Sequence, residues 1–146
     1  MKIIGGLFIL LSSIISSYAY EKSLKQEISR LSEIEKFLTH IKVQIEYFSS
    51  SLPDIYSSFG EKTDYILSAI ENKSVSGVPK DIKDKINHCL NTLGSGYKKE
   101  QLAILNLTVE EVNRTLNYVK ENLPNKLKAT RATSLFVGLS IVILLI

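Results

Sequence analysis

The stretch LKQEISRLSEIEKFLTHIKVQIEYF, residues 24–48, decides the fold. Its apolar side chains recur every three or four residues, and charged side chains fill the opposite face. This spacing is that of an amphipathic α-helix, and we expect one long helix from about Glu21 to Ser50. The predicted apolar stripe consists of Leu24, Ile28, Leu31, Ile34, Leu38, Ile41, Ile45, Phe48 and Leu52.

Short helices follow, each bounded by residues that favour turns. The sequence SSSLPD at 49–54 ends the first helix, and Asp54 is expected to cap a short helix through Phe59 that stops at Gly60. A second short helix carries Ile66 and Ile70. The stretch NKSVSGVPKD at 72–81 then has the composition of a linker.

Two further helices complete the chain between its apolar ends. Pro79 and Asp81 open a helix that the sequence Gly94-Ser95-Gly96 terminates. The last helix begins near Lys98, and Pro124 is expected to kink or interrupt it. No stretch alternates long enough for a strand, so we predict an all-α fold. The apolar stripe of the last helix consists of Leu102, Leu105, Val109, Val112, Leu116, Val119, Leu123 and Leu127.

Both ends of the chain are apolar. Residues 3–20 are eighteen residues without a charge, which meets the length of a membrane-spanning helix. Residues 132–146 are fifteen residues without a charge. As a helix they would be about 22 Å long, which is shorter than the bilayer core of about 30 Å. The long cationic side chains just before this segment can extend its reach by snorkelling. We therefore predict a transmembrane helix at 1–20, a helical cytoplasmic domain at 21–131 and a short C-terminal transmembrane segment at 132–146.

Two other interpretations of these ends stay open. Lys2, the apolar run after it and small residues before position 20 would also make a secretory signal that is cleaved after Ala19. The central domain would then be an exported binding module with a C-terminal membrane tail. Alternatively, the C-terminal run is a buried core helix of a soluble protein of the toxin or immunity type.

The charges favour a membrane protein that binds no nucleic acid. Of the 18 Lys and Arg, 17 lie between Glu21 and Arg131, together with all 15 Asp and Glu, so the central region is nearly neutral. Cations gather at both borders of the apolar ends, which by the positive-inside rule places both borders in the cytoplasm. They are Lys22, Lys25 and Arg30 at one border and Lys126, Lys128 and Arg131 at the other.

Catalytic chemistry is not indicated. His40 and His88 are far apart on predicted helices and are expected at the surface or half buried, and the single Cys89 is expected in the core. The chain has no metal-ligand spacing, no glycine loop for phosphate and no nucleophile motif. We predict no enzymatic activity, no catalytic residue, no metal, no cofactor and no small-molecule substrate.

Three short motifs stand out, GLSIVILLI at 138–146, LGSGYKKEQ at 93–101 and IEYFSSSLPDI at 45–55. They resemble motifs of the stage III sporulation protein AB family, whose helical domain is related to the F-type platform proteins of type II secretion. The ending GLSIVILLI, with Gly138, is similar to the family's C-terminus. The segment LGSGYKKEQ at 93–101 is similar to a family pattern through Leu93, Gly94 and Gln101, with Tyr97 where the family has aspartate. The segment IEYFSSSLPDI at 45–55 matches through Glu46 and Tyr47, with Leu52 and Pro53 in reversed order.

The chain departs from the family in its middle part. It has no Trp, and the region from Gly60 to Pro79 is abbreviated. It is therefore similar to a divergent member.

The resemblance implies a non-enzymatic membrane component of the channel that links the mother cell to the forespore. It implies a location in the mother-cell membrane around the forespore, with a platform-like cytoplasmic domain that docks a cognate sporulation ATPase and contacts other channel proteins. The turn containing Gly94, Tyr97 and Gln101 is the predicted docking region, because exposed loops on rigid helices often carry recognition. Equally, Gln101 can serve only to brace this turn.

Overall fold

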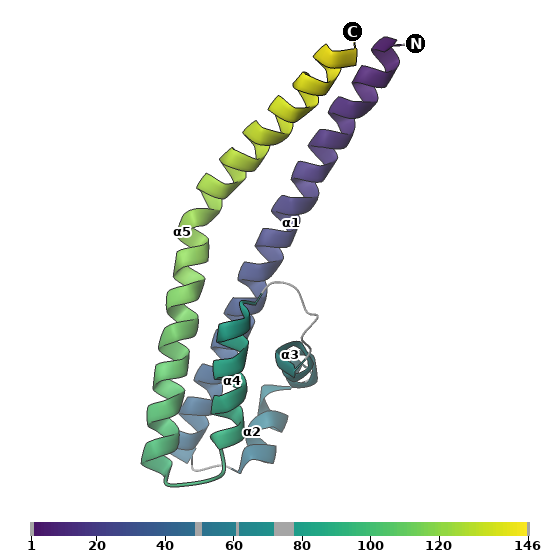
Figure 1. Ribbon diagram of the computed structural model, residues 1–146. Helices are drawn as coiled ribbons and strands as arrows, with labels where there is room; N and C mark the ends of the chain where they lie inside the picture. The colour runs from purple at the N-terminus through teal and green to yellow at the C-terminus, as the bar shows by residue number, and fades with distance from the viewer. Residues whose placement is uncertain (1, 49–50, 61, 72–77, 146) are drawn as a thin grey trace. The chain divides into compact units, whose positions relative to one another are not determined.

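The computed structural model describes residues 2–48, 51–60, 62–71 and 78–145. All regular structure in these residues is helical, and no strand occurs among them, so the predicted all-α class is confirmed for this part of the chain. The elements, shown in Figure 1, are α1 (Lys2–Val43), the π-helical turn η1 (Gln44–Phe48), α2 (Leu52–Phe59), α3 (Lys62–Glu71), α4 (Lys80–Thr92) and α5 (Lys98–Leu145).

The chain forms two compact units, and α1 and α5 each contribute to both. The core unit comprises Glu27–Tyr118, and the hairpin unit comprises Met1–Gln26 together with Val119–Ile146. The core unit contains η1, all of α2, α3 and α4, and parts of α1 and α5. The hairpin unit contains only the two outer parts of α1 and α5.

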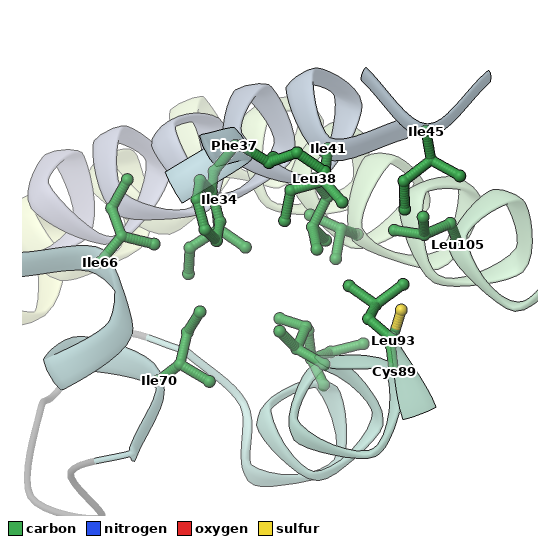
Figure 2. Packing of buried hydrophobic residues seen from close by; sticks show 14 residues of the cluster. Ile34, Phe37, Leu38, Ile41, Ile45, Ile66, Ile70, Cys89, Leu93 and Leu105 are labelled. Carbon is green, nitrogen blue, oxygen red and sulfur yellow. The ribbon is translucent and has the colours of Figure 1, made fainter. Parts of the chain in front are cut away.

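The predicted stripe of the first helix forms the centre of the core unit. Leu38, Ile41 and Ile45 are buried in one apolar cluster that also contains Leu105 and Val112 of α5. Figure 2 shows the side chains of Ile45 and Leu105 facing each other, with α4 residues on a further side of the cluster. The stripes predicted for the first and last helices therefore contribute to one buried cluster within this unit.

Phe37 widens the buried face beyond the predicted stripe. Its side chain is 0% exposed and is the largest fully buried one among the described residues. The ring stacks on Tyr56 at a centroid distance of 5.9 Å and meets the edge of Phe59 at 5.2 Å. Both partners belong to α2. The three-or-four spacing through Leu38 predicted one packing direction, whereas α1 is covered from two directions and needs a wider apolar face.

The expected burial of Phe48 is wrong. Its side chain is 67% exposed, although it continues the spacing of the stripe after Ile45. The reason is η1, since a π-helical turn bonds residue i to i+5 and takes in more residues than an α-helical turn. The extra residue rotates the positions after Ile45 away from the core. Lys98 Nζ donates a hydrogen bond of 2.8 Å to the carbonyl oxygen of Glu46 within this turn.

The expected helix stops are present, and one expected cap is wrong. Gly60 ends α2 with φ of 90°, and Gly94 follows α4 with φ of 85°, a backbone region that favours glycine. Pro79 occupies the position before α4. Asp54 does not cap α2, because Ser51 holds the N-cap position and Asp54 lies inside the first turn. There Asp54 accepts a hydrogen bond from the Ser51 hydroxyl.

The last helix continues through Pro124. Helix α5 runs from Lys98 to Leu145 with Pro124 in its interior, so the expected interruption does not occur. Of the predicted linker at 72–81, residues 72–77 lie outside the described part of the chain, as does the predicted helix end at Ser50.

We predict that Leu38→Ala destabilises the core unit by about 2 to 5 kcal/mol, because it removes buried methyl groups and leaves a cavity. Leu107→Ala, on an exposed side chain of α5, is the matched control and should change little. Thermal unfolding of the full-length protein in mild detergent, followed by circular dichroism, measures both. Equal melting temperatures for the two variants would contradict the packing described here.

Candidate functional site

The hairpin unit is a pair of antiparallel helices with small residues on the inside. Gly6 and Gly138 are buried, and a Cβ atom built on Gly138 would lie 3.2 Å from Leu10 Cδ2 and 3.5 Å from Ser13 Cβ. A Cβ on Gly6 would lie 3.4 Å from Val142 Cγ1. The two ends of the chain thus lie side by side, as Figure 1 shows for α1 and α5.

A hydroxyl joins the two helices near Gly138. Ser13 Oγ donates a short hydrogen bond to the carbonyl oxygen of Ser134 on α5. Ser12 and Ser140, by contrast, donate to carbonyl oxygens of their own helices, at Phe8 and Phe136. Hydroxyls that bond within or between helices satisfy their polar groups without water.

The large apolar side chains of the hairpin unit point outward. This is the reverse of a soluble protein, where such side chains form the core. In a membrane, lipid surrounds the large side chains, and small residues at the interface let helix backbones approach closely. The outward side chains are Leu7, Phe8, Leu11, Ile14, Ile15, Leu135, Phe136, Val137, Leu139, Ile141, Ile143 and Leu144.

Helix α5 can cross a membrane by length and composition. It is the one helix among the described residues searched that meets this measure, with a mean hydropathy of 1.5 over its most apolar window of 18 residues. Only 6% of that window is buried, whereas the core helix of a soluble protein would be mostly buried. The interpretation of the C-terminal run as a buried core helix is therefore not supported.

An ion cluster lies at the charged end of the hairpin unit. Glu21 pairs with Lys25 one turn later at 2.8 Å and with Arg131 of α5 at 2.6 Å. Hydrogen bonds from Lys25 and then Arg131 lower the pKa of the Glu21 carboxyl, so the group is ionised at neutral pH. The pair Glu21–Arg131 joins residues 110 positions apart in the sequence, one on each helix.

The predicted docking turn is braced from inside. The Gln101 side chain donates to the carbonyl oxygen of Gly96 at 3.1 Å, and its oxygen accepts from the Gly94 amide at 3.4 Å. Leu52 of α2 lies against Gly94, where an added Cβ would be 3.0 Å from Leu52 Cδ1. Gln101 therefore has the bracing role that the sequence left open.

Exposed aromatic side chains lie in this turn and in η1. Tyr97 is 80% exposed, and it adjoins Lys98, whose ammonium bonds the carbonyl of Glu46. That bond brings the exposed Tyr47 and Phe48 of η1 to the same end of the core unit. We call Tyr47, Phe48 and Tyr97 the aromatic tip. The sequence indicated Tyr97 and made no statement on the exposure of Tyr47. It placed Phe48 in the buried stripe because η1 was not predicted.

The other titratable residues singled out lie as expected. Cys89 is buried in the core cluster, and desolvation raises the pKa of its thiol, which is therefore neutral at pH 7. His40 is half buried and shares a hydrogen bond of 2.8 Å with Ser58, and His88 is exposed. Among the described residues, no group of three or more His, Cys, Asp or Glu could hold a metal ion.

These features define a membrane-associated all-α protein whose first and last helices pair at both ends. The family described as stage III sporulation protein AB matches residues 2–76 and 69–146, which together cover nearly the whole chain. The chain belongs to this family, as its three short motifs indicated, and membership implies a role in sporulation. No curated protein and no solved structure matches it.

The small-residue interface of the hairpin unit was missed at the sequence level, apart from Gly138. A signal was available, because Gly6, Ser13 and Ser17 share one helical face of the N-terminal apolar run at spacings of seven and four. Ser134 and Gly138 repeat this spacing of four on α5. Two such faces in two apolar runs indicate that the runs pack on each other.

We predict that Ser13→Cys combined with Gly138→Cys forms a disulfide in the full-length Cys89→Ala protein. The Cβ atoms would lie 3.5 Å apart, at the lower edge of the range of about 3.5 to 4.5 Å found in disulfides. Gly5→Cys with Gly138→Cys is the matched control, since a Cβ at Gly5 meets nothing within 4 Å. After oxidation and proteolysis of the core unit, terminal fragments should stay linked without reductant only in the first pair. Equal linkage in both pairs, or none in either, would contradict the hairpin.

Proposed function

We propose that this protein is a non-enzymatic membrane component of the sporulation channel between mother cell and forespore, with a platform-like core that docks a cognate ATPase. Family membership supports the sporulation role. The observation that carries the membrane part is the hairpin unit, where large apolar side chains face outward and glycine and serine face inward. The aromatic tip carries the docking part.

Both apolar ends are membrane-embedded in this proposal. Residues 1–20 and 132–146 form two membrane segments, and residues 21–131 form the domain between them, as the sequence predicts. Ser13 and Gly138 lie in opposite segments and pack together, so the two segments share one depth range in the bilayer. Cations at the inner borders orient the domain toward the cytoplasm of the mother cell, and both chain ends toward the opposite side.

Pairing of the two ends argues against cleavage of the N-terminal segment. Removal of residues before Tyr20 would take Gly6, Leu10 and Ser13 away from α5 and leave the Gly138 face uncovered in lipid. Helix α1 also runs without a break from Lys2 to Val43, so the bond after Ala19 lies inside a regular helix. A peptidase needs an extended substrate, and a continuous helix does not present one.

We expect the intact mass of the membrane-extracted protein to include the N-terminal segment. Protease added outside cells should leave the core unit undigested, because the proposal places that unit in the cytoplasm. The same protease added after permeabilisation is the control and should digest it. A mature chain that begins at Tyr20, with digestion from outside, would replace this proposal with the exported binding module.

Docking on the aromatic tip follows from its rigidity and exposure. The bonds of Gln101 hold the turn that carries Tyr97, so the ring is presented at little entropic cost on binding. Exposed aromatic side chains are enriched among residues that carry binding energy at protein interfaces. The core unit has eleven Lys and Arg against thirteen Asp and Glu, which favours protein partners over nucleic acid. Other channel proteins are expected partners as well.

We predict that Tyr97→Ala weakens binding of the sporulation ATPase to the full-length protein by about tenfold or more, as expected for an aromatic anchor. Tyr65→Ala, on the exposed face of α3, is the matched control and should bind like the wild type. Pull-down with purified ATPase and nucleotide measures this. Wild-type protein that fails to bind at tens of micromolar would remove the docking proposal, and equal loss in both variants would remove the aromatic tip.

A further inference from the structure

A small groove lies at the charged end of the hairpin unit. Its volume is about 250 Å³, and it opens between the two helices. Ile14 and Leu135 line its apolar side, and Tyr18, Glu21 and Arg131 line its polar side. The groove therefore changes from hydrocarbon to charge over about one helical turn, which is the change that a phospholipid makes between its acyl chains and its phosphate.

We propose that this groove binds an anionic phospholipid of the cytoplasmic leaflet, with the phosphate at Arg131 and the acyl chains against Ile14 and Leu135. The inference rests on the proposed membrane insertion of both chain ends. It goes beyond it by assigning a specific ligand class to named side chains.

The charges at the groove favour an anion in spite of Glu21. The Glu21 side chain is 15% exposed and its carboxylate is paired with two cations, so the three groups together carry one net positive charge. Between residues 21–26 and 119–131 the hairpin unit has six Lys and Arg against two Glu. An excess of this size at a membrane border attracts anionic headgroups.

Arg131 keeps donors available beside its ion pair. Its Nη2 atom bonds Glu21 Oε2, and the guanidinium has five N–H groups in a planar fork. The side chain is 61% exposed, so the remaining donors are accessible to a phosphate. Glu21 thereby acts as a positioning residue, because its carboxylate holds the guanidinium at the mouth of the groove.

Tyr18 sets the depth of the groove in the bilayer. Its side chain is exposed, and tyrosine rings concentrate at the level of the headgroups. Ile14 precedes Tyr18 by one helical turn, and Leu135 follows Arg131 by one turn, so both lie on the apolar side of this level. Lipid is the occupant that matches this lining, since a phospholipid at this depth places its acyl chains beside apolar groups and its phosphate beside a cation.

A larger groove of the same unit lacks the features that indicate a phospholipid site. It is lined by hydroxyl-bearing residues including Ser12, Ser16, Thr130 and Thr133. The hydroxyls of Ser12 and Thr133 already bond carbonyls of their own helices, and no charged residue lines this groove.

The test uses full-length protein in nanodiscs and in mild detergent. Native mass spectrometry of protein equilibrated with phosphatidylglycerol and phosphatidylcholine of identical acyl chains should show one retained phosphatidylglycerol per chain, preferred by about fivefold or more. Arg131→Gln should abolish this preference. Arg114→Gln, which removes the same charge from another exposed arginine–glutamate pair, is the matched control and should keep it.

The integrity of the hairpin in Arg131→Gln is checked separately, with the disulfide between Ser13→Cys and Gly138→Cys as readout.

Inorganic phosphate at millimolar concentration should not displace the lipid, because the acyl contacts would be missing. Equal retention of the two lipids, equal loss in both arginine variants, or displacement by phosphate would each overturn the lipid site. Crosslinking of a second chain through Tyr18→Cys would instead assign the groove to protein. Extraction of the chain without detergent would overturn the proposed function itself.

Discussion

The pairing of the first helix with the last is the constraint on which the rest of the structure depends. Each of the two units contains a segment of α1 and a segment of α5. In the core unit, Lys98 bonds the carbonyl of Glu46, and Leu38 shares a cluster with Leu105. In the hairpin unit, Arg131 bonds Glu21, and Gly138 lies against Leu10 and Ser13. Residues of α2, α3 and α4 belong to the same buried cluster as Leu38 and Leu105.

The two units use the same pairing with opposite side-chain chemistry. Phe37 in the core unit is fully buried, because water drives apolar surface into contact. Phe136 in the hairpin unit is 72% exposed, and the interface of this unit places Gly6 against Val142 and Gly138 against Leu10 and Ser13. Lipid is as apolar as phenylalanine, so burial gains nothing there, and close backbone packing holds the helices instead. The core unit therefore has the side-chain pattern of a protein in water, and the hairpin unit has that of a protein in lipid.

Periodicity predicted the parts of the fold that depend on one helical face. The stripes through Leu38 and Leu105, the stops at Gly60 and Gly94, and the all-α class were all accessible from the sequence. Phe37 was missed because a single stripe cannot indicate that α2 covers a second side of α1. Phe48 was misplaced because a π-helical turn changes the period within a few residues.

Local rules also failed where tertiary packing outweighed them. An interior proline costs about 3 kcal/mol, but Pro124 stands in a helix of 48 residues that is bonded to α1 after the proline, through Arg131 and Ser134. Asp54 is a good cap by residue type, yet the chain enters α2 one turn earlier, at Ser51. In both cases the wider structure, rather than local propensity, determines where the helix begins or continues.

The candidate site was the least predictable part, because its contacts join distant residues. Glu21 and Arg131 were both recognised as charged residues at the borders of the apolar ends, but nothing in the sequence indicated that they form an ion pair. The sequence indicated Gln101 and Gly94 together because they belong to one turn, and residues close in the sequence are also close in space there. The ion pair needed the register of α1 against α5, which the small residues of the hairpin unit set.

The same register explains why charge can stand at the border of an apolar unit. Glu21 alone next to hydrocarbon would favour its neutral form, since desolvation opposes ionisation. Lys25 and Arg131 reverse this balance and lower its pKa, so the carboxylate stays charged and keeps the guanidinium in place. The pairing of the two helices thus produces a fixed, exposed cation at the level where lipid phosphates lie. If one helix slid by a single turn, about 5.4 Å, Glu21 and Arg131 would separate. Both their ion pair and the groove beside it would then be lost.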